Sequence, residues 1–195
     1  MNDLISFCRG PLFFFSIAVF VLGGLRHIIM RVYMKDETPR EGCLLREGGL
    51  WLAPLRLLFL TGMVLVPLFF TGHIRLWERG TGVSWPALDQ PLVCLLTIVT
   101  AVLGLVLLVA RLAIPCLRAS RHPDVWLIPP LVSLTFISGY LLAHPDSHVL
   151  PLKPLVLLHV LSAETLLVRL PFSYILACIT HPLGRLRQVA TGGTR

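Results

Sequence analysis

Three polar side chains lie inside the last long apolar stretch of the sequence, residues 152–178. They are His159, Glu164 and Arg169. Each is costly at membrane depth and therefore needs a partner or a function. An imidazole at this depth is a known axial ligand of haem iron, and a carboxylate can accept a proton or contact a quinone. The alternative is structural, with His159 bonded to a neighbouring helix and the two charged groups held in ion pairs.

Composition defines the class of protein. Of the 195 residues, 55% are hydrophobic and only 14% are charged, whereas a soluble domain has nearer a quarter charged. The sequence therefore predicts a single integral membrane domain over residues 1–195. The net charge of +7 comes without any basic nucleic-acid-binding motif, so nucleic acid is not an expected partner. The five cysteines include no CxxC or CxxCH pattern, which argues against a zinc site, an iron–sulfur cluster or a covalently attached c-type haem.

The elements that must position these residues are apolar stretches long enough to cross a bilayer as helices. We expect an all-α bundle of five such spans, at residues 12–29, 51–73, 92–114, 125–142 and 152–178. Pro67 should kink the second span, and residues 75–90 read as an interfacial loop. Gly23 and Gly24 can permit close packing of another helix. The short connection after the fourth span predicts that the fourth and fifth helices are antiparallel neighbours.

Basic residues predict the orientation, because they concentrate in cytoplasmic loops. With the N-terminus outside, the inner loops and tail carry more Arg and Lys than the outer ones. The C-terminus is then cytoplasmic, and the N-terminus is not a cleaved signal peptide. This orientation places His73, at the end of the second span, on the outer side together with His159, which lies ~10 Å inside the fifth span. Two neutral imidazoles on facing helices can hold one six-coordinate, low-spin haem suited to electron transfer. Histidines at helix ends are also common interfacial hydrogen-bonding groups, so both interpretations stay open.

The remaining charged residues have less defined roles. Glu164 and Arg169 are five residues apart and do not share one helix face, so each is expected to pair elsewhere. Arg56 is a candidate partner of Glu164. In the functional alternative, Glu164, Arg169 and Arg56 contact a quinone or take part in proton transfer. Arg75, two residues beyond His73, is a candidate partner of a haem propionate.

A family resemblance rests on two segments. The fifth stretch carries His159, a twelve-residue step to the triplet Pro171-Phe172-Ser173, and a basic tail, and the second carries Gly72-His73. In these features the sequence resembles the gamma subunit of respiratory nitrate reductase, a family of five-helix membrane cytochromes b. Related members are the membrane subunits of sulfite-reductase-associated and heterodisulfide-reductase-like complexes.

This resemblance implies that His73 and His159 are the axial ligands of one haem b. In two-haem relatives two more histidines occur, and the matching positions here are Met63 and Ala177. One haem is therefore expected, although Met63 as a thioether ligand and an inner site built from His181 with His27 or His122 remain weaker alternatives.

The sequence thus predicts a membrane subunit that passes electrons between menaquinone or ubiquinone and a partner, without being an enzyme on its own. The resemblance implies that the partner is a cytoplasmic iron–sulfur subunit and leaves a periplasmic cytochrome c as a further candidate. The location would be a bacterial or archaeal cytoplasmic membrane. The main alternative is a cofactor-free membrane anchor or assembly subunit. A small transporter is disfavoured, because no inverted repeat is visible.

Overall fold

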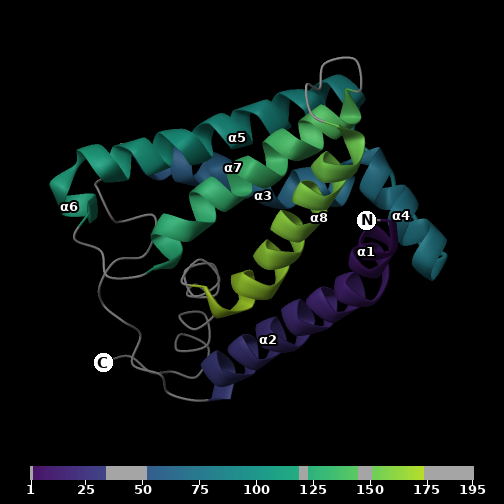
Figure 1. Cartoon of the computed structure of the whole chain (residues 1–195). Coiled ribbons are helices and arrows are strands. Elements are labelled where there is room, and N and C mark those ends of the chain that lie inside the picture. Colours follow the sequence, from purple (N-terminus) through teal and green to yellow (C-terminus); the bar gives the residue numbers. More distant parts are fainter. Residues whose placement is uncertain (1, 34–51, 119–122, 145–150, 174–195) are drawn as a thin grey trace.

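A computed structural model describes residues 2–33, 52–118, 123–144 and 151–173, and these residues form helices and no strand (Figure 1). Four helices are long and apolar enough to cross a membrane, or five if the bent pair α3 and α4 is one span. The chain therefore has the build of a multi-pass membrane protein. The elements in order are α1 (Asn2–Phe7), the π-helical turn η1 (Cys8–Leu12), α2 (Phe13–Tyr33), α3 (Ala53–Phe69), α4 (Thr71–Thr81), α5 (Gln90–Ala113), α6 (Pro115–Arg118), α7 (Asp124–Ala143), α8 (Leu152–Arg169) and the 3-10 turn η3 (Leu170–Phe172).

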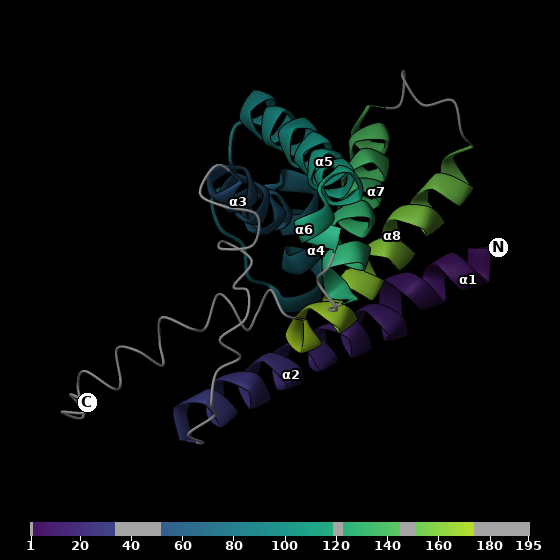
Figure 2. The same cartoon turned by 90° about the vertical axis from the view of Figure 1, so that its left-hand side faces the viewer.

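Helices α3, α5, α7 and α8 pack side by side in that order, and α2 lies against α8 and η3. Figure 2 shows α1 and α2 following each other in nearly one line, with α8 packed across them. The adjacency predicted for the fourth and fifth spans is thus confirmed as the α7–α8 contact. Large apolar side chains such as Phe59 and Ile128 fill the centre between α3, α5 and α7.

Small residues set how closely these helices approach. A Cβ added to Gly104 in α5 would come within 2.9 Å of the Pro129 carbonyl oxygen of α7. One added to Gly23 in α2 would come within 2.7 Å of the Pro171 ring. A Cβ added to Gly24, by contrast, would meet no other described residue within 4 Å. The prediction of close packing is therefore confirmed for Gly23, and Gly24 has no such contact in the described part of the chain.

The predicted spans agree with the helices along most of their length. The stretches 12–29, 92–114 and 125–142 coincide with α2, α5 and α7 to within a few residues. The first helical stretch begins earlier than predicted, because α1 and the π-helical turn precede α2 and Pro11 lies inside that turn. The fifth helix begins at Leu152 as predicted but ends at Arg169, before Pro171, and residues 174–178 lie outside the described part.

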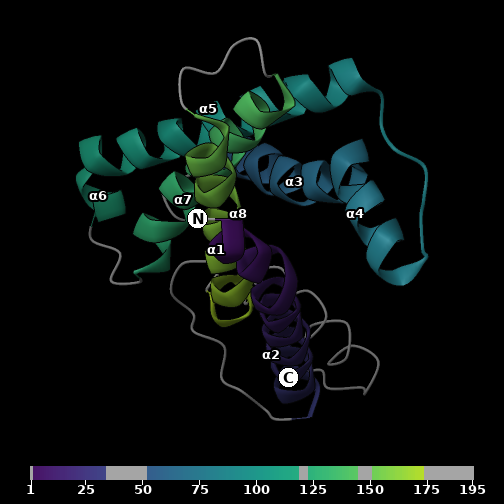
Figure 3. The same cartoon turned by 45° about the vertical axis from the view of Figure 1, so that its right-hand side comes forward.

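The second predicted span needs a larger correction. Residues 71–81, expected to belong to the end of the span and an interfacial loop, form helix α4, which is bent by 50° from α3 (Figure 3). The helix breaks at Phe70, whose backbone is extended (φ −75°, ψ 126°), three residues beyond Pro67. Proline has no N–H to donate, so the helical hydrogen-bond ladder is already weakened there. The kink was predicted, but the helix that follows it was not.

Candidate functional site

The structure brings His73 and His159 together. His73 lies in the first turn of α4 and His159 in the first half of α8, and their ring centres are 6.2 Å apart. The two ring planes are inclined by only 10°. Both side chains are half-buried. The sequence prediction that these two histidines share a site is therefore consistent with their placement, and they are called the histidine pair below.

The break between α3 and α4 positions His73. A helix end leaves carbonyl groups without intrahelical partners, and in a membrane each must find a donor within the protein. The Nδ1 atom of His73 is 3.1 Å from the carbonyl oxygen of Pro67 and serves one of them. The next two carbonyls are served by the segment that follows α4: the Trp85 indole N–H donates to Leu68 O (2.7 Å), and the Leu88 backbone N–H donates to Phe69 O (3.1 Å).

Helix α7 positions His159. The Nδ1 atom of His159 is 3.0 Å from the carbonyl oxygen of Thr135 and 3.3 Å from the Ser138 hydroxyl. The Ser138 hydroxyl donates its own proton to the same Thr135 carbonyl at 3.0 Å. Its lone pairs therefore face the imidazole. Both neighbours of this ring nitrogen act as acceptors.

These contacts determine the tautomer of both rings. A carbonyl oxygen can only accept, so Nδ1 must carry the proton in His73 and in His159. The lone pair of each ring is then on Nε2. Metal-ligating histidines are held in the same way, with one ring N–H donated to a backbone carbonyl and the other nitrogen on the metal. The histidine pair is therefore prepared for ligation through Nε2.

Gly139 makes room for the His159 ring. A Cβ at this position of α7 would lie 2.8 Å from Cε1 and 3.2 Å from Nδ1 of His159. Such distances are too short for ordinary contacts, so any larger residue would displace the imidazole. No role for Gly139, Thr135 or Ser138 could be predicted from the sequence. Only their position opposite α8 reveals one.

The spacing of the histidine pair fits ligation of one metal. Two imidazoles bound trans to a metal through bonds of about 2 Å have their ring centres roughly 6 Å apart. The observed separation of 6.2 Å agrees with that value. Among the described residues no group of three or more His, Cys, Asp or Glu side chains is arranged to hold a metal ion. Two imidazoles are the number of protein ligands that a six-coordinate haem iron takes, and this donor set fits a haem b.

The side chain of Arg75, the predicted propionate partner, extends from a different side of helix α4 than that of His73. It is exposed on α4, two residues after His73. Residues two apart on a helix do not face the same way. Arg75 therefore does not point alongside His73, and its contact with a haem propionate stays a prediction.

The alternative haem ligands receive little support. Met63 is buried among the apolar side chains of the core, with Phe59 and Val66 from the same helix. Such packing is the ordinary role of a methionine. His27 is half-buried in α2. The positions of His122, His181 and Ala177 lie outside the described residues.

Glu164 is buried in α8, with 5% of its surface exposed, and neither carboxyl oxygen makes a hydrogen bond within the described part of the chain. The predicted pairing with Arg56 is therefore wrong. Helix α8 packs against the π-helical turn, and Cys8 of that turn is close enough for its thiol to interact electrostatically with Glu164. A buried carboxylate without a partner is costly, so the neutral acid is the favoured form at this position.

Arg169 has a partner that the sequence analysis missed. Its Nη2 and Nε atoms lie 2.8 and 2.9 Å from Oδ1 of Asp124, which is buried at the start of α7. The two residues are 45 positions apart in the chain. The expectation that Arg169 pairs away from Glu164 is confirmed, and the partner ties the end of α8 to the beginning of α7.

Comparison with known proteins adds a distant relative. A protein of Nitratidesulfovibrio vulgaris (strain Hildenborough) is 33% identical over 117 residues, which are 60% of this chain and 50% of the relative. The chain thus spans about half the length of the relative that it matches, whose name states no activity. No protein-family model matches the chain, and no solved structure matches it.

Proposed function

We propose that this chain is a haem b-containing membrane subunit of a redox complex, and that it transfers electrons between the quinone pool and a partner subunit. The observation that supports the proposal is the histidine pair, whose rings are 6.2 Å apart and nearly parallel. The haem, when bound, supplies reversible one-electron chemistry. Ligation by His73 and His159 leaves no open position for oxygen, which suits a carrier rather than an oxidase.

The chain's own residues hold the ligands in place before any cofactor binds. The Pro67 carbonyl fixes the ring of His73, and the Thr135 carbonyl fixes that of His159. Each hydrogen bond keeps the Nε2 lone pair available and limits rotation of the ring. Because the acceptors are backbone groups of two packed helices, little reorganisation is needed when the iron changes its charge.

Glu164 is proposed to carry a proton. Oxidation of a quinol releases two protons with its two electrons, and a carboxyl group inside the membrane can receive one of them. Glu164 lies five residues from His159 on α8, ~7.5 Å along the helix axis. Its lack of a hydrogen-bond partner leaves its oxygens available for this exchange. Menaquinone and ubiquinone remain equal candidates as the substrate.

Sequence features support the proposed orientation and partners. The distribution of basic residues supports an outer N-terminus and a cytoplasmic C-terminus in a bacterial or archaeal cytoplasmic membrane. The resemblance to the nitrate reductase gamma subunit supports a cytoplasmic iron–sulfur subunit as the electron partner. A periplasmic cytochrome c is a second candidate partner on the outer side, where the histidine pair would lie.

The absorption spectrum of the purified chain tests this proposal. After expression with ample haem, the reduced protein should show the sharp bands of a low-spin cytochrome b. A pyridine-haemochrome assay should give one haem per chain. A colourless chain would contradict the proposal and favour the cofactor-free anchor. Two haems per chain would mean that His27, His122 or His181 also provides a ligand.

A further inference from the structure

A cysteine and a histidine meet where α5 begins and α7 ends. The Sγ atom of Cys94 in α5 lies 3.8 Å from Nε2 of His144, the residue that follows α7. The other ring nitrogen of His144, Nδ1, is 2.9 Å from the carbonyl oxygen of Tyr140. A carbonyl oxygen can only accept, so Nδ1 carries the proton and the lone pair of Nε2 faces the thiol. The imidazole is thus placed to take the proton of Cys94.

Two neighbours complete this arrangement. The side-chain amide of Gln90, one turn earlier on α5, donates to the Cys94 sulfur at 3.6 Å, which favours negative charge on that atom. The ring of Tyr140 stacks on that of His144, with ring centres 4.2 Å apart, and limits its rotation. A thiol, a base within reach of it and a group that orients the base are the parts of an activated nucleophile.

An apolar groove between α5 and α7 leads to this thiol. It runs along residues 97–105 of α5 and 136–141 of α7, has a volume of about 160 Å³, and presents only apolar surface from the described residues. Ile98 and Val102 on its rim are about half exposed, so the groove opens toward the bilayer.

The groove and the thiol lie on the same faces of the two helices. On α5, the lining residue Ile98 follows Cys94 by four positions, and on α7, the lining residue Tyr140 precedes His144 by four. Residues at this spacing form one stripe along a helix. Cys94 and His144 therefore stand at the end of the groove, one turn beyond its lining.

We infer that Cys94 is an S-acylation site: its thiol accepts a long-chain acyl group from an acyl thioester, and the acyl chain lies in the groove between α5 and α7. The groove extends ~12 Å along α5, and its apolar lining fits a hydrocarbon chain rather than a headgroup. A thioester whose chain lies in the groove brings its carbonyl carbon to Cys94. Cysteines near the ends of membrane helices are common sites of this reversible modification.

The transfer needs only the acyl thioester as co-reactant. As the Cys94 sulfur attacks the thioester carbonyl, Nε2 of His144 takes the thiol proton. The Gln90 amide can donate to the carbonyl oxygen that becomes negative. The bond from the carbonyl carbon to the original sulfur then breaks, and the imidazolium returns the proton to that leaving thiolate. The products are one S-acyl bond on Cys94 and one free thiol, with no change of oxidation state.

Acyl transfer to the purified chain tests the inference without involving any haem. The full chain in detergent is treated with neutral hydroxylamine, which cleaves thioesters, and is then incubated with palmitoyl- or acetyl-coenzyme A. Mass spectrometry of the intact chain and of its peptides gives the rate and the position. The wild type should take up one palmitoyl group on Cys94, about tenfold faster than an acetyl group because the groove buries the longer chain. Cys94→Ser should take up none, and Cys8→Ser should behave like the wild type.

Two further variants separate the base from the groove. His144→Ala should slow the transfer of both acyl groups at least tenfold, and added imidazole should restore part of the rate. Val102→Phe fills the groove and should slow palmitoyl but not acetyl transfer. Val109→Phe, at an exposed position of α5 outside the groove, should slow neither.

Three results would overturn the inference. They are a wild type that takes up no palmitoyl group or takes it up equally on other cysteines, an unchanged rate in His144→Ala, and equal palmitoyl transfer to Val102→Phe and Val109→Phe. The first is measured on the wild type and decides the matter even if a variant does not fold.

Discussion

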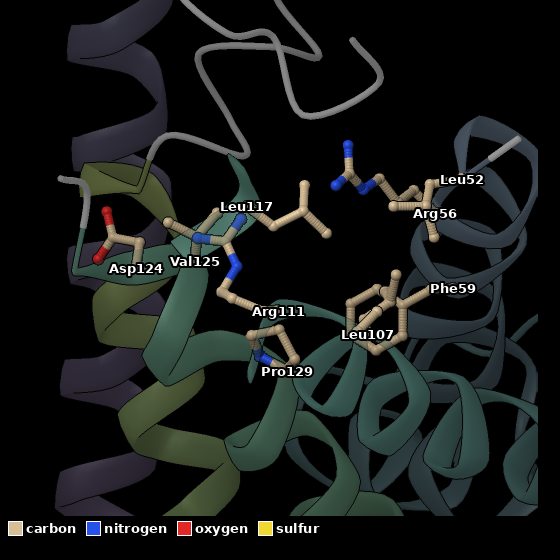
Figure 4. Close-up of a pocket in the computed structure, with 10 residues that line it drawn as sticks. Leu52, Arg56, Phe59, Leu107, Arg111, Leu117, Asp124, Val125 and Pro129 are labelled. Atoms are coloured by element: carbon tan, nitrogen blue, oxygen red, sulfur yellow. The ribbon is translucent and has the colours of Figure 1, made fainter. Parts of the chain in front are cut away.

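The two ends of the bundle hold their buried polar side chains in different ways. The histidine pair lies near the C-terminal half of α7, and Arg56, Arg111 and the Asp124–Arg169 ion pair lie near its beginning (Figure 4). Asp124 and Gly139 are ~22 Å apart along that helix. At the first end, neutral imidazoles are held by backbone carbonyls. At the second, charged guanidinium groups gather around an ion pair and an aromatic ring.

This difference shows what each end is suited to bind. Carbonyl acceptors fix the tautomer of an imidazole and leave a lone pair for a metal, without adding charge. Buried guanidinium groups carry no lone pair for a metal and keep their positive charge. One end therefore holds neutral imidazoles and the other holds charged guanidinium groups. A substitution at one end should therefore leave the other end unaffected.

The largest effect is expected from removing a ligand at the histidine end. His159→Ala or His73→Ala leaves the iron with one protein ligand, so the haem should be lost or become high-spin and reactive to carbon monoxide. The helices should still insert, because insertion depends on apolar length and flanking charge. Absorption spectra of the purified variants measure this.

His144→Ala is the matched control for that experiment. His144 is also a histidine near this end of α7, where its Nδ1 donates to the Tyr140 carbonyl at 2.9 Å. Its replacement should leave the low-spin spectrum unchanged. If His144→Ala abolishes the spectrum while His159→Ala keeps it, the fourth span supplies the ligand and the assignment of the histidine pair is wrong.

A smaller effect at the same end is expected from crowding the ring. Gly139→Ala places a methyl group 2.8 Å from Cε1 of His159, so the imidazole must shift. The variant should bind haem several-fold less well than the wild type, as measured by haem titration. Gly24→Ala, with no neighbour within 4 Å in α2, should bind it normally. Equal behaviour of the two variants would show that the ring does not depend on this space.

Glu164 lies between the two ends, and its replacement should raise stability but slow turnover. Glu164→Leu removes a buried carboxyl group without a hydrogen-bond partner, so the free energy of unfolding should rise by about 1–3 kcal/mol. Quinol-dependent haem reduction should slow at least tenfold, because a proton acceptor is lost. Thr165→Leu, at an exposed neighbouring position, should change neither. Unchanged reduction in Glu164→Leu would mean that this residue carries no proton.

The smallest effect is expected for the ion pair at the arginine end. Asp124 is buried, but the Arg169 side chain is 41% exposed, so solvent screens the pair. A double-mutant cycle with Asp124→Asn and Arg169→Gln should give a coupling energy of about 1 kcal/mol. Thermal unfolding in detergent measures it. A coupling above about 3 kcal/mol would instead indicate a fully desolvated pair.

The elements that could be predicted from the sequence are those whose formation depends on nearby residues in the chain. Apolar length located α2, α5 and α7, and Pro67 indicated the kink. Helix α4 was missed because its sequence, TGHIRLWERGT, is amphipathic and short; it ends at Gly82 in the left-handed conformation (φ 76°). The break before it depends on donors for the last carbonyls of α3, which the chain after α4 provides. Such tertiary contacts leave no local pattern.

The same distinction applies to the site. His73 and His159 could be selected because a histidine in an apolar span is conspicuous in the sequence. Thr135 and Gly139 could not, since a backbone carbonyl and an absent side chain become meaningful only when α7 lies against α8. The Asp124–Arg169 pair joins residues from two helix ends that lie 45 positions apart, so no local pattern marks it.

The orientation of the two rings offers the most direct test of the central claim that His73 and His159 ligate one iron. Their planes differ by 10°, and parallel imidazole planes give a rhombic low-spin ferric signal in electron paramagnetic resonance. We predict one such signal per chain in the oxidised protein, absent from His73→Ala and His159→Ala. A high-spin signal alone, a low-spin signal of the kind given by crossed planes, or no haem signal at all would contradict the claim.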